Sequence, residues 1–285
     1  MFSILLEDCY WSSVTSNKVN RDASFERFGY SSSVSGIQAG VERTFNNDWQ
    51  AGVALGVESN SFSENDTLRA QSSGDGVMVG LSLKRKVADA GLVAASISGG
   101  RTSYTTTRRV NIFKPGIAEA KSSTEFFDAR LRMAWQYEKK HFFMIPQAEF
   151  SLTSLHQNKF AETGIAGLGV ASPGNTQNLA SIMPALEMGW AYGNNPGERR
   201  SRISLGLGAR YQLKDQLSLP FGFVDAPTGT PSALISNSID AQSYSAKIGV
   251  ETVAGKNGVI SLGYQYEAGK STQSHYLGGK FGIKF

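Results

Sequence analysis

Residues 127–137 read Phe-Asp-Ala-Arg-Leu-Arg-Met-Ala-Trp-Gln-Tyr, so every second side chain is apolar and most of those between are polar or charged. Successive side chains of a β-strand point to opposite faces, and this alternation therefore predicts a strand with one apolar and one polar face. The polar face would carry Asp128, Arg130, Arg132 and Gln136. An apolar core cannot bury that much charge, so this face has to meet water.

The same alternation returns along the whole chain. Most of the alternating segments reach the 9–11 residues that a tilted strand needs to cross a bilayer. We count twelve such segments, near residues 7–14, 33–45, 49–59, 75–84, 91–101, 125–137, 142–155, 182–192, 201–213, 243–253, 258–267 and 274–285.

The links between these segments alternate in length. Those after even-numbered segments are short and comprise residues 46–48, 85–90, 138–141, 193–200 and 254–257. Those after odd-numbered segments are mostly longer and comprise residues 15–32, 60–74, 102–124, 156–181 and 214–242, with only 268–273 short. An even strand count with short turns at one end and long loops at the other is typical of bacterial outer-membrane barrels. The sequence therefore predicts an all-β fold, a 12-stranded antiparallel transmembrane β-barrel of the bacterial outer membrane, over a soluble sandwich.

In such a barrel the apolar faces contact lipid and the polar faces line the lumen. The predicted lumen-facing polar residues are Gln38, Glu42, Glu58, Asp128, Arg130, Arg132, Gln136, Glu149, Glu187, Arg210, Lys247, Glu251 and Glu267. Two interpretations of these charges remain open: they solvate the wall and pair across strands, or they contact a polypeptide in the lumen.

Composition excludes several other classes of protein. The chain has 285 residues, and its single cysteine, Cys9, rules out an intramolecular disulfide framework and a multi-cysteine zinc site. A net charge of +4 is too small to indicate a nucleic-acid partner. No run approaches the roughly 18 apolar residues of a transmembrane helix, and the residues from Met1 to Asp8 do not read as a signal peptide. The three dispersed histidines show no metal-ligand spacing, and we expect no cofactor.

The end of the chain, Tyr276-Leu-Gly-Gly-Lys-Phe-Gly-Ile-Lys-Phe285, resembles the C-terminal assembly signal of outer-membrane proteins. In that signal a terminal phenylalanine follows hydrophobic residues at alternate positions, and the barrel-assembly machinery recognises it. Phe281, Ile283 and Phe285 match this pattern.

The rest of the chain resembles the translocator domain of autotransporters, the monomeric type V secretion proteins. The likeness rests on Tyr10-Trp11 and on four segments: Ser35-Gly-Ile-Gln-Ala-Gly-Val-Glu42, Trp49-Gln-Ala-Gly-Val-Ala-Leu-Gly56, Ile145-Pro-Gln-Ala-Glu-Phe150 and Phe160-Ala-Glu-Thr-Gly164. The resemblance implies a barrel that enables export of an N-terminal passenger to the cell surface, with a linker in the lumen. Its implied partners are outer-membrane lipid, the barrel-assembly machinery, and the passenger and linker, with no nucleic acid. We interpret residues 1–6 as a linker remnant and 7–285 as a single barrel domain.

Two other functions compete with this interpretation. A small outer-membrane porin or passive channel is the first alternative. Without a linker helix in its lumen, the barrel should conduct ions weakly unless it is plugged, and loop 214–242 is the candidate plug. An outer-membrane enzyme is the second, but residues two positions after His141, His156 and His275 are not serine, unlike the His-x-Ser pair of outer-membrane phospholipases. No obvious pair of acids flanks a histidine as in omptin proteases, so we expect no enzymatic activity.

Overall fold

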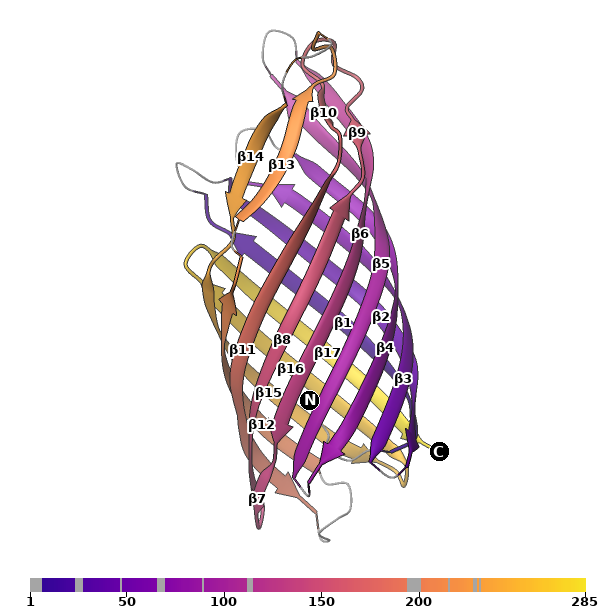
Figure 1. Ribbon diagram of the computed structural model, residues 1–285. Coiled ribbons are helices and arrows are strands. Elements are labelled where there is room, and N and C mark those ends of the chain that lie inside the picture. Colours follow the sequence, from indigo (N-terminus) through magenta and orange to yellow (C-terminus); the bar gives the residue numbers. More distant parts are fainter. Residues whose placement is uncertain are drawn as a thin grey trace.

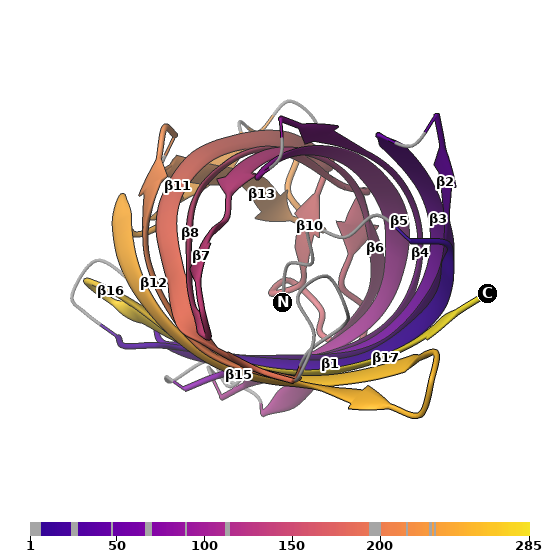
Figure 2. The ribbon, with the colours of Figure 1, turned by 90° about the horizontal axis from the view of Figure 1, so that it is seen from below.

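The chain folds into a single β-barrel, seen from the side in Figure 1 and along its axis in Figure 2. The computed structural model describes residues 7–23, 28–46, 48–65, 70–88, 90–111, 115–193, 201–214, 216–227, 230 and 232–285. Within these ranges, no helix is long and apolar enough to cross a membrane. Residues 1–6, predicted to be a linker remnant, lie outside the described part of the chain.

Twelve antiparallel strands form the barrel wall, as predicted. They are β1 (Cys9–Arg21), β2 (Tyr30–Phe45), β3 (Trp49–Glu64), β4 (Gln71–Val87), β5 (Gly91–Val110), β6 (Gly116–Trp135), β8 (Phe142–Gln157), β11 (Asn175–Tyr192), β12 (Ser201–Gln212), β15 (Gln242–Ala254), β16 (Gly258–Gly269) and β17 (Thr272–Lys284). Each strand pairs with its neighbour in the chain, and β1 pairs with β17 from Cys9–Lys284 to Arg21–Thr272. The wall therefore closes with no free edge.

Apolar side chains cover the outside of the wall. Leu55 and Val57 are 66% and 57% exposed, whereas the buried hydrophobic residues among those described are few, and the cluster they form consists of Ala134, Phe143, Ile145 and Ala191. This is the reverse of a water-soluble protein, in which large apolar side chains are mostly inside. An apolar surface this extensive needs a lipid environment.

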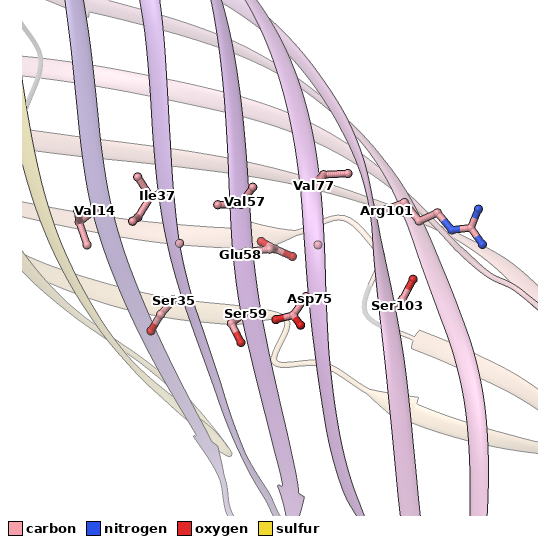
Figure 3. A pocket seen from close by; sticks show the side chains of 12 residues that line it. Val14, Ser35, Ile37, Val57, Glu58, Ser59, Asp75, Val77, Arg101 and Ser103 are labelled. Atoms are coloured by element: carbon pink, nitrogen blue, oxygen red, sulfur yellow. The ribbon is translucent and has the colours of Figure 1, made fainter.

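The outward-facing apolar side chains form a band around the barrel, which we call the apolar belt. This belt ends abruptly toward one end of the barrel. Figure 3 shows this boundary on the outer wall over β1 to β5. Val14, Ile37, Val57 and Val77 are partners in successive strands and form the last apolar row. The next outward row consists of Ser35, Ser59, Asp75 and Ser103. We call the end beyond this boundary the loop end, and the opposite end, with the β2–β3, β4–β5 and β15–β16 connections, the turn end.

Strands extend further toward the loop end than predicted. The predicted link 102–124 is mostly strand, because β5 runs to Val110 and β6 starts at Gly116; the predicted link 60–74 is likewise shortened, and the first strand extends to Arg21. Beyond the belt both faces are wet, so hydroxyl side chains replace the apolar row; Ser33 and Ser61, for example, are hydrogen-bonded at 2.8 Å. Backbone pairing continues there without the alternation that identifies a half-buried strand.

Five short strands lie outside the main wall. At the turn end, β7 (Tyr137–Lys139) extends the β6–β8 hairpin. At the loop end, β9 (Phe160–Ala161), β10 (Val170–Ser172), β13 (Gln216–Phe223) and β14 (Ala233–Ser238) form a small sheet in the order β14-β13-β10-β9 (Figure 1). The β13–β14 hairpin belongs to the predicted loop 214–242, so part of that segment forms a sheet at the loop end.

Candidate functional site: the wall of the lumen

The predicted lumen residues come from alternate positions of the wall strands, on the face opposite the apolar belt. On β2 and β4, Glu42 and Lys84 form an ion pair at 2.7 Å, with side chains 12% and 23% exposed. The ammonium group of Lys280 from β17 lies 4.8 Å from the ring centre of Trp11, in a cation–π contact. This side of the wall therefore holds its cations against an acid or an aromatic ring.

The opposite side of the wall, on β6 and β8, carries a second set of pairs. Asp128 accepts hydrogen bonds from Arg130 Nε and from Thr153 Oγ1, both at 2.7 Å. Arg132 donates from Nε to Glu149 at 2.8 Å and from its terminal nitrogen to the same carboxylate oxygen. Each arginine is thus joined to an acid on its own strand or the next.

A third set lies on β12, β15 and β16. Arg210 Nε donates to Glu267 Oε1 at 3.1 Å, and Ser243 donates to the same oxygen at 2.5 Å. Nearby, Lys247 and Glu187 line a small cavity of about 90 Å³ together with the Arg132–Glu149 pair. Glu187 is only 3% exposed, so this cavity holds an acid shielded from bulk water.

The remaining predicted lumen residues have polar contacts or partners of their own. Glu58 accepts from Asn60 Nδ2 at 2.9 Å and from Thr102 Oγ1 at 3.0 Å. Gln38 donates to the sulfur of Met78, and Gln136, at the turn end, donates to Glu138 at 2.9 Å. Glu251 on β15 is the register partner of Arg202 on β12.

Most charges of the lumen wall are therefore neutralised within the wall. Paired charges keep the surface hydrated but leave little net attraction for a charged side chain that passes. This arrangement favours the first of the two open interpretations, mutual pairing across strands.

Trp11 is a lumen residue that the sequence analysis did not select as a site. Its indole lies close to Gly40 of β2, where an added Cβ would come within 2.8 Å of the ring. The indole Nε1 is buried and finds no hydrogen-bond partner among the described residues. In the sequence, Tyr10-Trp11 contributes only to the family resemblance. The signal for a lumen position is a tryptophan on the polar face of an alternating strand.

A buried ion pair at the loop end was also missed. Arg108 of β5 donates to Glu162 from Nε at 3.0 Å and from a terminal nitrogen at 2.5 Å. The same carboxylate accepts from the backbone of Val170 at 2.8 Å, and Arg108 also donates to the carbonyl of Leu168 at 3.1 Å. Gly164 follows in a left-handed conformation with φ of 91°, which suits glycine. The Phe160–Gly164 segment therefore fastens the loop to the β5–β6 hairpin.

At the turn end, the residues before β1 are held against the wall. Gln50, which is 2% exposed, donates to the carbonyl of Glu7 at 2.6 Å. The carboxylate of Asp8 accepts from the backbone of Thr44 at 2.6 Å, and Lys284 donates to Glu7 at 3.2 Å. Gln50 belongs to the inner face of β3. Its hydrogen bond to Glu7 therefore places the start of the described chain beside the turn-end mouth of the lumen.

No group of three or more His, Cys, Asp and Glu side chains within the described ranges is arranged to hold a metal ion. The three histidines are apart from one another: His141 contacts the Ala191 carbonyl, His156 the Thr176 hydroxyl and His275 the Tyr264 hydroxyl.

Comparison with known proteins identifies the family. The model of the autotransporter β-domain matches residues 10–265 of this chain. The chain belongs to the autotransporter β-domain family. The predicted family and the predicted barrel are therefore confirmed, and this β-domain is an outer-membrane translocator for passenger export.

Solved structures with the same fold include three β-domains. The translocator domain of NalP from Neisseria meningitidis has a TM-score of 0.79 at 15% identity, covering 99% of this chain and 90% of that one. The β-domain of the Bordetella autotransporter BrkA has a TM-score of 0.72 at 16% identity, covering 98% and 100%. The transport unit of AIDA-I from Escherichia coli has a TM-score of 0.63 at 13% identity, covering 97% and 89%. No curated protein sequence matches this chain significantly.

Proposed function

We propose that this β-domain exports a passenger that precedes it in the same polypeptide, with the connecting linker in the lumen. The single observation that carries the proposal is the polar wall of paired charges, because it offers a hydrated path without a strong binding site. The contacts of Glu7 and Asp8 support it, since they bring the chain to the turn-end mouth of the lumen. In outer-membrane barrels the short turns face the periplasm, so the passenger would leave through the loop end.

The second part of the proposal concerns assembly. Phe281, Ile283 and Phe285 are 41%, 44% and 54% exposed and face outward along the last strand. The ring of Phe285 also stacks on Tyr10 of β1, with centroids 4.5 Å apart. We propose that the barrel-assembly machinery recognises this apolar row, and that outer-membrane lipid covers it afterwards.

We also propose that the β-domain is a transport barrel without catalytic activity of its own. The histidine contacts support this, because each is to a carbonyl or hydroxyl group near the rim or on the outer face. The passive-channel alternative differs from the proposal in one respect only, the fate of the polypeptide upstream of Glu7.

The decisive experiment measures where the polypeptide upstream of Glu7 is located. The β-domain is expressed behind a signal peptide and an epitope-tagged N-terminal segment, and protease accessibility of the tag is measured on intact cells. We expect the protease to reach the tag on the cell surface in cells whose barrel is folded, as judged by heat modifiability. A folded barrel with the tag retained in the periplasm would favour the channel and contradict the proposal.

A further inference from the structure

The outer wall carries two arginines inside the turn-end margin of the apolar belt. Arg43 lies on β2 between the outward positions of Val41 and Phe45, and Arg85 follows Leu83 on β4. Both side chains are on the exposed face. Strands β2, β3 and β4 lie side by side, as Figure 2 shows, so the two guanidinium groups flank the same stretch of β3.

An aromatic pair, which we call the Phe45–Trp49 floor, lies beside the two arginines. Phe45 and Trp49 are register partners, and their rings stack with centroids 6.5 Å apart and planes at 13°. The guanidinium carbon of Arg85 lies 5.0 Å from the ring centre of Trp49. Arg43 is the register partner of Ala51, the next outward residue of β3 after Trp49, and Ala51 has only a small side chain.

Neither arginine is neutralised by a carboxylate of the described residues. Within the described part of the chain, no carboxylate forms an ion pair or hydrogen bond with either guanidinium. The nearby carboxylate of Asp8 is used by the backbone of Thr44. Another outward arginine, Arg101, lies toward the loop end, where a terminal nitrogen is 3.8 Å from Glu125. A cation beside the hydrocarbon region needs a counter-ion, because isolated charges there are strongly unfavourable.

The surroundings indicate what supplies that counter-ion. The belt adjoining the arginines is apolar: Val53 and Leu83 are 43% and 40% exposed. Tryptophan rings favour the level of the lipid headgroups, and planar guanidinium groups bind phosphate oxygens in pairs. A ligand that fits therefore has a phosphate group joined to long acyl chains.

We propose that Arg43, Arg85 and Trp49 form a binding site for the phosphate of a glycerophospholipid in the periplasmic leaflet. The acyl chains lie over the apolar belt beside Val53 and Leu83, and the headgroup lies against the Phe45–Trp49 floor. This assignment rests on the membrane orientation of the β-domain and not on export of a passenger.

The test measures lipid bound to the purified, folded β-domain. Native mass spectrometry quantifies the phosphatidylglycerol that stays bound after detergent extraction. It then measures binding of phosphatidylglycerol that is titrated back onto the protein. The variant carries Arg43→Gln and Arg85→Gln, and the matched control carries Arg101→Gln and Arg109→Gln, two outward positions of β5 toward the loop end. Heat modifiability verifies that both fold.

We expect apparent affinity for phosphatidylglycerol to fall about thirtyfold in the first variant and to remain unchanged in the control. This corresponds to about 1 kcal/mol for each basic side chain near an anionic membrane surface, at about 1.4 kcal/mol per factor of ten. Equal affinities in both variants would overturn the proposal. A photoreactive residue at Ala51 gives a second readout in cells: adducts with lipid support the site, whereas adducts with a protein would show that this surface docks a protein instead. Both readouts are independent of passenger export.

Discussion

Replacing Glu162 by glutamine should release the loop that Glu162 fastens to β5. The side chains of Glu162 and Arg108 are only 8% and 16% exposed, so the substitution leaves an almost buried guanidinium without its anion. Breaking a fully buried pair destabilises by 3–5 kcal/mol, and exposed pairs contribute about 0–1 kcal/mol. Because this pair lies at the loop end near water, we expect the substitution to lower the free energy of local loop opening by about 2 kcal/mol, a value between these two ranges.

The assay is limited trypsin digestion of the folded barrel at Lys159, which lies in the fastened loop. When opening is fast relative to cleavage, the cutting rate follows the population of the open form. A change of about 2 kcal/mol therefore predicts roughly thirtyfold faster cleavage at Lys159, with the heat-modifiable barrel intact.

Glu125→Gln is the matched control for this prediction. Its pair with Arg101 spans 3.8 Å, and the two side chains are 50% and 60% exposed. Such a pair contributes about 0–1 kcal/mol, so cleavage should change by less than about fivefold. Equal cleavage rates for Glu162→Gln and Glu125→Gln would refute the argument that burial gives the Glu162 pair its effect.

Three further predictions concern assembly, the lumen and pH. Deleting Phe285 or replacing it with aspartate should lower the amount of heat-modifiable barrel in the outer membrane; normal levels at native expression would contradict the assembly-signal interpretation. Gly40→Val should displace the Trp11 indole, which we expect to see as a shift in tryptophan emission of the folded barrel, whereas an unchanged spectrum would show that the ring does not rest on Gly40. Burial raises the pKa of Asp240, but hydrogen bonds from Ser271 and Thr272 outweigh it, so the pKa is below its ordinary value. The turn they form is therefore stabilised at neutral pH and loses this contribution as the pH falls through the folded pKa. The protection factors of the two amides, which correct for the intrinsic pH dependence of hydrogen exchange, should fall in acid, and Asp240→Asn should remove this dependence; if the variant keeps it, another group is responsible.

The membrane-spanning part of the fold could be predicted from the sequence because lipid imposes a strict rule on each strand. One face meets hydrocarbon and the other meets water, so alternation as in residues 127–137 identifies each crossing. Beyond the belt this constraint ends, and the serine-rich continuations of β2 and β3 show no period. The β13–β14 hairpin was missed for another reason: its leucines and phenylalanines alternate, but Pro220 lies among them and argues against a strand in the wall.

Side-chain pairing was predictable only in part. The sequence placed Glu42 and Arg132 on the polar face, but it could not assign their partners, since these depend on register. The Arg108–Glu162 pair joins residues 54 positions apart through an irregular loop, and no local pattern predicts such a contact. That no described carboxylate pairs with Arg43 is likewise a property of register, because it depends on which side chains lie opposite on β3.

The pairing of β1 with β17 has a consequence for the order of events during folding. Asn17 and Ser274 are hydrogen-bonded although they lie 257 positions apart in the chain. Joining such distant points has an entropic cost of about 5 kcal/mol from the length-dependent term alone, and no part of it is recovered until the last strand exists. Until then the growing sheet has two open edges, each able to pair with another strand. The β1–β17 pairing, where the beginning and the end of the chain meet, is therefore the last one to form as the barrel closes.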